Sequence, residues 1–140
     1  DAQFCYDYLL KHYSEKEITL YGRSLGTGIA SYLVSKNQPR QLILETPYYS
    51  ILDIAKQRFP MFPVNQLLKY NFPTFQYLPK AKCPITIIHG TDDSIVPYSS
   101  GKKLSELGLD NLKFITIEGG SHNDLINYEA YENVIFQRLK

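Results

Sequence analysis

The sequence lacks the features that assign a chain to several specialised classes of protein. It has only two cysteines, Cys5 and Cys83, which lie far apart and exclude a disulfide framework or a cysteine-rich metal site. Its 15 basic and 14 acidic residues are scattered, so no electrostatic footprint points to nucleic acid or to an anionic membrane. No apolar run is long enough to span a bilayer. We therefore expect no nucleic-acid partner and no membrane segment in this chain.

The composition that remains is that of an ordinary globular protein. Hydrophobic residues make up 44% and charged residues 21% of the chain, which excludes intrinsic disorder and a fibrous fold. A length of 140 residues is enough for one buried hydrophobic core. We therefore predict a single domain over residues 1–140.

Short apolar runs bounded by turn residues alternate with longer amphipathic stretches. This alternation is typical of the α/β class, in which a parallel sheet is flanked by helices. The strands are expected at residues 18–21, 42–44, 85–89 and 113–117, and the helices around residues 4–9, 29–34, 102–107 and 128–139.

The interval between the second and third expected strands has a different composition. Residues 46–82 show no strand pattern and are rich in proline and aromatic residues. The prolines divide this interval into short helices and turns, because proline interrupts regular hydrogen bonding. We predict a short, helical, lid-like insertion over one end of the sheet.

The stretch GRSLG, residues 22–26, lies where the first expected strand gives way to a helix. A tight turn at this place would hold Ser24 in a strained backbone conformation, with its hydroxyl thrust out of the sheet. We expect side chains at either glycine of this stretch to collide with their neighbours, and Gly28 and Ala30 to let the helix pack closely on the strands. The backbone N–H of Leu25 would point at a developing negative oxygen. Ser24 is therefore the candidate nucleophile.

A serine needs a base that is itself oriented by an acid, and the chain has three histidines. His12 lies in the first amphipathic helix and is expected at the surface. His89 ends an apolar strand, where a buried, hydrogen-bonded structural role is expected. His122 follows the fourth expected strand in a loop of small residues, so it is the best candidate base.

Two aspartates are candidates for the acid. Asp92 and Asp93 lie in the loop after the third expected strand, before Pro97 opens a helix. One of the pair is expected to be only a turn former or a helix cap. The chain order nucleophile, acid, base is the order that a serine on this kind of turn requires, and all three candidates follow parallel strands at their carboxyl ends.

Three motifs together, "GRSLG", "HGTDDSIVP" and "GGSHND", resemble the α/β-hydrolases. The resemblance spans nearly the whole chain and covers the C-terminal half of that fold. It is strongest to a branch of small serine hydrolases that includes acyl-protein depalmitoylases and peptidase-related esterases. The resemblance implies a partial α/β-hydrolase fold that works without a metal or an organic cofactor.

The resemblance also implies roles for individual residues. Ser24 matches the family's nucleophile and His122 its base. The family's acid falls fourth after the histidine of the His-Gly pair, which selects Asp93 over Asp92. Glu45 occupies a place where some members of the superfamily keep their acid, so it is a rival for that role.

Two further residues match positions after the family's histidine. Asn123 and Asp124 are interpreted as groups that order the histidine loop and take no part in the chemistry.

The chain departs from the family at its beginning. Relative to the family, the first four strands are absent, together with the loop that supplies the second oxyanion donor. The sequence also has no initiator methionine, so we expect it to be part of a longer chain. The segment at residues 18–21 would then be an unprotected sheet edge, and we expect the chain alone to self-associate and to have low activity. A cytoplasmic location is favoured, and the absent half could carry a membrane anchor.

These observations predict a serine hydrolase that cleaves carboxyl esters or thioesters through an acyl-enzyme, with a small-molecule or acyl-ester substrate. The alternatives are an aminopeptidase-like hydrolase, in which Glu45 or Asp53 receives the substrate amine, and a non-catalytic ligand-binding domain that keeps the three residues as a relic. Large apolar side chains of the insertion are candidates for an acyl pocket, although most of them are expected to pack the insertion onto the sheet. They are Tyr48, Tyr49, Phe59, Met61, Phe62, Leu67, Phe72 and Phe75.

Overall fold

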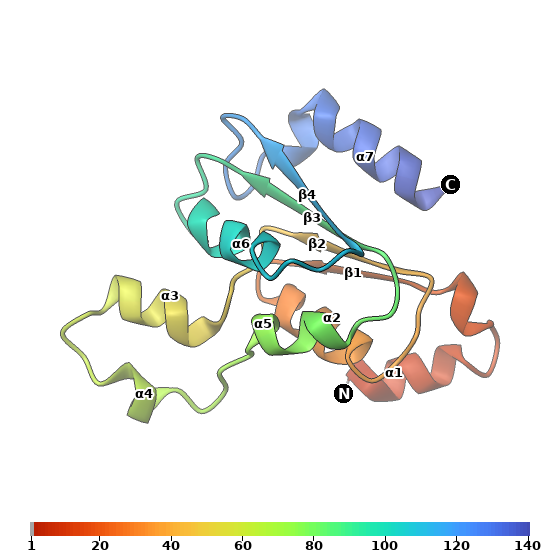
Figure 1. Cartoon of the computed structure of the whole chain (residues 1–140), viewed down its shortest axis with the longest axis horizontal. Coiled ribbons are helices and arrows are strands. Elements are labelled where there is room, and N and C mark those ends of the chain that lie inside the picture. The colour runs from red at the N-terminus through yellow and green to blue at the C-terminus, as the bar shows by residue number, and fades with distance from the viewer. Residues whose placement is uncertain (1) are drawn as a thin grey trace.

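Four parallel strands form the centre of the computed structural model, which describes residues 2–140. The strands follow one another across the sheet in the order β1-β2-β3-β4. The predicted α/β class is confirmed, and each strand lies where the apolar pattern placed it (Figure 1). Their bounds are β1 Thr19–Arg23, β2 Gln41–Glu45, β3 Ile85–Gly90 and β4 Leu112–Ile117.

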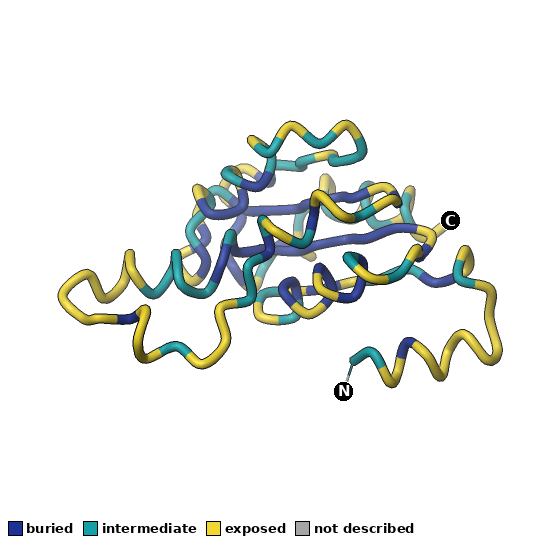
Figure 2. The backbone as a smooth tube through the Cα atoms, turned by 60° about the horizontal axis from the view of Figure 1, so that its bottom comes forward, coloured by how far each residue is buried: buried dark blue, intermediate teal, exposed yellow. Residues whose placement is uncertain are grey.

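The two central strands carry the hydrophobic core. Every residue of β2 and β3 is buried, which explains why both read as continuous apolar runs rather than as alternating ones (Figure 2). Successive side chains of a strand point to opposite faces, so the two strands supply two apolar clusters, one on each side of the sheet.

Helices cover both faces. On one face, α2 (Gly26–Val34) and α6 (Tyr98–Ser105) bury Ala30, Val34 and Leu104 against β2 and β3. On the other face, η3 (Leu125–Asn127) and α7 (Glu129–Leu139) cover the second cluster (Figure 1).

The N-terminal helix lies beside the sheet rather than on its centre. The helix α1 (Ala2–Leu9) buries Tyr6, which packs with Ile18 and Leu33. The short helix η1 (Glu15–Glu17) then leads into β1. Within residues 2–140, no helix combines the length and the apolar character needed to cross a membrane.

The strand-free insertion between β2 and β3 is present and helical, as predicted. It contains α3 (Ile51–Arg58), α4 (Val64–Leu67), α5 (Thr74–Tyr77) and η2 (Leu78–Lys80). Its outer turn extends away from the sheet and is exposed (Figures 1 and 2). Four of the side chains expected to form a pocket or to pack on the sheet are instead exposed: Phe59, Met61, Phe62 and Leu67.

Candidate active site

Ser24 lies in the connection between β1 and α2, at the carboxyl end of the sheet. Its φ angle is 50°, in the left-handed region that non-glycine residues rarely adopt, so the predicted backbone strain is confirmed. The Ser24 N–H donates to the carbonyl of Glu45 at 3.0 Å, and the Thr27 N–H donates to the Ser24 carbonyl at 3.0 Å. These bonds compensate for the strain and fix the turn.

The glycines around Ser24 serve different purposes. A Cβ at Gly22 would lie 2.7 Å from the carbonyl oxygen of Gly26 and 2.9 Å from the Cβ of Ala30, so the predicted collision at position 22 is confirmed. At Gly26 the prediction is wrong, because nothing lies within 4 Å of such a Cβ. Gly28 does not face the strands, since its close neighbour is the hydroxyl of Tyr48 at 2.1 Å from a Cβ there.

His122 follows β4 in the loop that leads to η3 and reaches across to Ser24. Its Nε2 lies 3.0 Å from the Ser24 Oγ, and its Nδ1 lies 2.8 Å from the Oδ2 of Asp93. The ring is almost fully buried. The three candidate residues, which come from three separate loops, are therefore joined in one line of hydrogen bonds.

Asp93 is a buried carboxylate with several donors. Its Oδ1 accepts from the backbone N–H groups of Ile95 at 2.9 Å and Val96 at 2.8 Å. Burial raises the pKa of the Asp93 carboxyl, but hydrogen bonds from His89 and His122, followed by those backbone N–H groups, outweigh it and lower the pKa to about 2. The group is therefore ionised at neutral pH and acts as an acceptor.

The ionised carboxylate determines the tautomer of His122. Since Asp93 can only accept, Nδ1 of His122 carries the proton and donates to it. The other nitrogen, Nε2, is then unprotonated and can accept the hydroxyl proton of Ser24.

The other candidates do not join Ser24 to His122, although His89 contacts Asp93 from the far side, with its Nε2 3.4 Å from Oδ2. Asp92 is exposed and accepts from Thr91 in the turn after β3. His89 is fully buried, and its Nε2 donates to the Val96 carbonyl at 3.0 Å, as the structural role predicted for it requires. His12 is exposed, also as predicted. Glu45 does not contact His122 through its side chain, because its carboxylate pairs with Arg23 at 2.9 Å.

Arg23 contacts the histidine loop, a role that the sequence did not reveal. Its Nη2 donates to the carbonyl of His122 and to Oδ1 of Asn123, each at 2.7 Å. Asp124 accepts from the Ser121 N–H at 2.7 Å, so both residues after His122 order the loop as interpreted. The only sequence signal for Arg23 is its place directly before Ser24.

Leu25 caps the start of α2, so its backbone N–H is at the positive end of a helix next to Ser24. The Leu25 carbonyl accepts the hydroxyl of Tyr48 at 3.1 Å. Burial raises the pKa of Tyr48 to about 12, which keeps this donor protonated. Within the described residues, no group of three or more His, Cys, Asp or Glu side chains is placed to hold a metal ion.

An apolar cavity of about 250 Å³ opens beside Ser24. Of the side chains expected in an acyl pocket, only Tyr48 lines it. The others come from the start of α2, from α3 and from the loop of Asp93: they are Leu25, Ile51, Ile54, Arg58, Ile95 and Val96.

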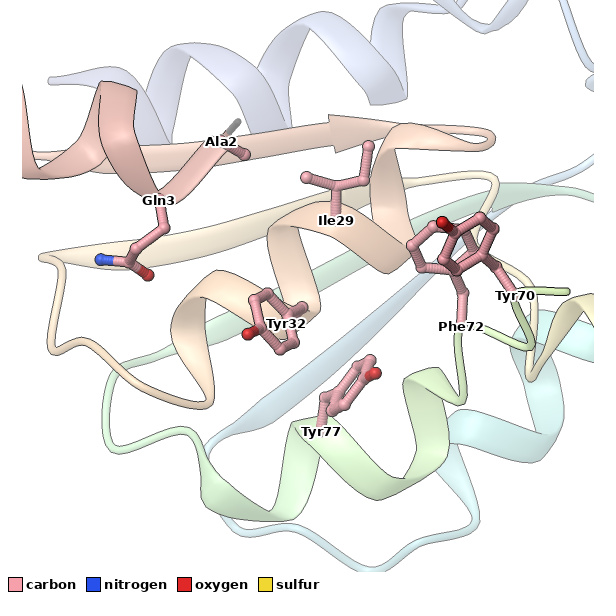
Figure 3. Close-up of a pocket in the computed structure, with 7 residues that line it drawn as sticks. All are labelled: Ala2, Gln3, Ile29, Tyr32, Tyr70, Phe72 and Tyr77. Carbon is pink, nitrogen blue, oxygen red and sulfur yellow. The ribbon is translucent and has the colours of Figure 1, made fainter.

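A larger cavity of about 420 Å³ lies elsewhere, between α1, α2 and the insertion (Figure 3). Its wall is mostly aromatic, and Tyr32 and Tyr77 approach edge to face within it at 5.6 Å. It includes none of the three hydrogen-bonded residues. Phe72, one of the expected pocket residues, lines this cavity instead, whereas Tyr49 and Phe75 stack on each other and pack against the core.

Comparison with known proteins identifies relatives with the same kind of fold. No family model matches the chain. The α/β-hydrolase domain-containing protein aho-3 of Caenorhabditis elegans is 32% identical over 117 residues, which cover 84% of this chain and 34% of that protein. The α/β-hydrolase domain-containing protein 17C of Mus musculus is 32% identical over 128 residues, which cover 91% of this chain and 37% of that protein.

A third relative is the lysophosphatidylserine lipase ABHD12 of Danio rerio, 30% identical over 129 residues that cover 76% of this chain and 33% of the lipase. The chain therefore spans about a third of the length of these curated relatives.

Solved structures share the fold. An α/β serine hydrolase homologue from Coxiella burnetii superposes with a TM-score of 0.71 at 21% identity, over 100% of this chain and 57% of that one. An acylaminoacyl peptidase superposes with a TM-score of 0.70 at 14% identity, over 96% of this chain and 25% of that one. With the parallel sheet and these relatives, the chain belongs to the α/β-hydrolase superfamily.

Proposed function

We propose that this chain carries the active centre of a serine hydrolase that cleaves carboxyl esters or thioesters. The observation that supports the proposal is the unbroken line of hydrogen bonds from Ser24 through His122 to Asp93, with distances of 3.0 and 2.8 Å. A nucleophile, a base and an orienting acid in this geometry are the requirements for acyl transfer.

The proposed reaction proceeds in two halves. Ser24 Oγ attacks the acyl carbonyl while its proton passes to Nε2 of His122, and the N–H of Leu25 donates to the developing oxyanion. The leaving alcohol or thiol takes that proton, and the acyl group remains as an ester on Ser24. Water then attacks this ester with His122 as base and releases the carboxylic acid, which regenerates the hydroxyl of Ser24.

The cavity beside Ser24 is evidence that the protein recognises the acyl group of its substrate. Its lining is largely aliphatic, and Ile51, Ile54 and Ile95 would exclude water from a bound hydrocarbon. The zebrafish relative is named a lysophosphatidylserine lipase, which is consistent with an acyl-ester substrate.

The two carboxylates that could receive a substrate amine in the aminopeptidase alternative, Glu45 and Asp53, already have partners in the structure. The carboxylate of Glu45 accepts from Arg23 and from the hydroxyl of Tyr131 at 2.8 Å. Asp53 accepts from Lys103 at 3.1 Å. A substrate ammonium group would therefore have to displace Arg23 or Lys103, which favours the ester or thioester substrate.

A fluorophosphonate probe tests the proposal because it labels an activated serine and does not merely occupy a pocket. In the full-length protein, Ser24→Ala should abolish both labelling and ester hydrolysis, and His122→Ala should be about as damaging because the residues act as a unit. Labelling that persists at another serine would refute the assignment of Ser24. If the native protein binds an ester but is not labelled by the probe, the result would support the alternative of a non-catalytic ligand-binding domain.

The acid is tested separately. Asp93→Asn should lower turnover by several orders of magnitude with the fold intact, because an asparagine amide favours the wrong imidazole tautomer. Asp92→Asn is the matched control and should retain most of the activity, since Asp92 is exposed and does not contact His122. Greater sensitivity at Asp92, or silencing by Glu45→Gln alone, would contradict the choice of Asp93.

A further inference from the structure

We infer that Arg23 is a positioning residue that holds the loop of His122 against the turn of Ser24. Its relevance to catalysis rests on the proposed function, but the positioning itself is a structural statement that is measured without turnover. Arg23 touches none of the three residues' reacting atoms; it acts through the main chain of His122.

The guanidinium joins two loops that are far apart in the sequence. Arg23 ends β1 directly before Ser24, and its Nη2 donates to the carbonyl of His122 and to Asn123 Oδ1, each at 2.7 Å. One nitrogen thus bonds both the histidine and its neighbour. Any movement of this loop relative to the end of β1 would break at least one of the two bonds.

The remaining side of the guanidinium is anchored to β2. Nε of Arg23 donates to Oε1 of Glu45 at 2.9 Å, and Arg23 and Glu45 are register partners in the sheet. Glu45 is almost fully buried and also accepts the hydroxyls of Tyr21 and Tyr131. The carboxylate of Glu45 therefore neutralises Arg23 and fixes one edge of its planar guanidinium to the sheet. The opposite edge is thereby oriented toward the histidine loop.

Other hydrogen bonds hold the loop on either side of His122, whereas Arg23 bonds the carbonyl of His122 itself. The N–H of Gly119 donates to Thr91 Oγ1 at 2.8 Å, the N–H of Asp92 donates to the Gly120 carbonyl at 2.9 Å, and the N–H of Ser121 donates to Asp124 at 2.7 Å. Gly119 has a φ of 72°, which glycine adopts without strain. His122 must keep both ring nitrogens at hydrogen-bond distance from partners on two other loops. A displacement of about 1 Å at such a site can cost roughly a hundredfold in rate.

The test compares Arg23→Gln with native protein. Arg23→Gln should lower the rate of fluorophosphonate labelling and kcat by roughly a hundredfold, with KM little changed, because the substrate cavity does not include Arg23. Arg23→Lys keeps the charge pair with Glu45 without the fork, so it should fold normally and show an intermediate loss.

A spectroscopic readout makes the test independent of turnover. The Nδ1 proton of His122, donated to Asp93, should give a downfield NMR resonance in native protein that is broadened or lost in Arg23→Gln and weakened in Arg23→Lys. Arg40→Gln is the matched control. Arg40 is exposed, and among the described residues its side chain makes no hydrogen bond or ion pair, so both the resonance and the labelling should be unchanged.

Two results would overturn the inference. One is an unchanged resonance and labelling rate in Arg23→Gln. The other is an Arg23→Lys variant that folds like native protein but loses the resonance and the labelling as completely as an Arg23→Gln variant whose thermal unfolding midpoint has collapsed, which would indicate general damage to the fold. If native protein takes no label but the resonance still depends on Arg23, the proposed function fails while the positioning role stands.

Discussion

Asp93 is a charged side chain in a buried position, and its hydrogen bonds offset the cost of removing the charge from water. The carboxylate is only 6% exposed, yet it accepts from two backbone N–H groups and faces the rings of His89 and His122. These donors replace the water that burial removes. The pKa of Asp93 consequently falls to about 2, below that of an aspartate in the unfolded chain.

This lowered pKa predicts a pH dependence of stability. A carboxyl whose pKa is depressed in the folded state stabilises the protein at pH values above its unfolded pKa, and that contribution is lost as pH falls through the folded value. Asp93 should therefore contribute about 2 kcal/mol to the free energy of unfolding near neutral pH, lost between about pH 5 and pH 2. Denaturant unfolding across this range measures it.

The matched variants separate Asp93 from the other carboxyl groups. Asp93→Asn should remove this part of the pH dependence, whereas Asp92→Asn should keep it. Identical acid profiles for native protein and Asp93→Asn would contradict the assigned pKa.

At the scale of elements, helix α2 packs against two different neighbours through its small residues. Gly22 of β1 and Ala30 of α2 approach each other closely, which brings the helix onto the sheet. Gly28 lies on another side of α2 and makes room for the hydroxyl of Tyr48, which belongs to the start of the insertion. The insertion is thus joined to the helix that follows Ser24.

A pair of glycine variants tests this arrangement. Gly28→Ala should destabilise the fold by about 1–3 kcal/mol, because the added methyl group overlaps the buried Tyr48 hydroxyl. Gly26→Ala is the control and should be neutral or should stabilise by up to about 1 kcal/mol, since the site is open and alanine favours a helix. Thermal unfolding midpoints distinguish them, and equal losses would show that Tyr48 is not the cause.

The insertion and the loop of Asp93 are also connected. Arg58, in the last turn of α3, donates to the carbonyls of Ser94 at 2.7 Å and Ile95 at 2.9 Å. The same helix lines the cavity beside Ser24 through Ile51 and Ile54. One wall of the proposed substrate cavity therefore depends on contacts between the insertion and the sheet's carboxyl end.

At the scale of the whole molecule, the sheet has an open side. Among the described residues, β1 pairs only with β2, and Tyr21 on this strand is 48% exposed. Apolar side chains of α1, such as Phe4 and Tyr8, are exposed as well. An unpaired parallel strand offers backbone donors and acceptors to other chains.

We therefore predict that the 140-residue chain by itself self-associates. Its mean mass in static light scattering should rise with protein concentration. Because Cys5 is exposed, the measurement requires reducing conditions, so that disulfide-linked dimers are not counted. A mass that stays at that of one chain across the concentration series would contradict the prediction.

The sequence alone determined the features that depend on local pattern. Apolar runs bounded by turn residues located all four strands. The signal is most continuous in β2 and β3, because these two strands are buried on both faces of the sheet. The backbone strain at Ser24 followed from its place in a tight turn between a strand and a helix, and the structure shows it as a positive φ. The sequence reduced the candidates for an acid in this loop to Asp92 and Asp93, and the family resemblance selected Asp93, whose carboxylate accepts from His122 in the structure.

Only the tertiary structure decided the features that depend on which distant segments meet. Arg23 and the carbonyl of His122 are separated by 99 residues in the chain, and no local pattern records their contact. Glu45 was a rival of Asp93 in the sequence, but in the structure its carboxylate bonds to Arg23 and Tyr131 and not to His122. The sequence likewise could not distinguish Met61, which is exposed, from Ile54, which lines the cavity beside Ser24. Hydrophobicity indicates only that a side chain favours burial. The packing of neighbouring elements determines which apolar side chains are buried and which residues they contact.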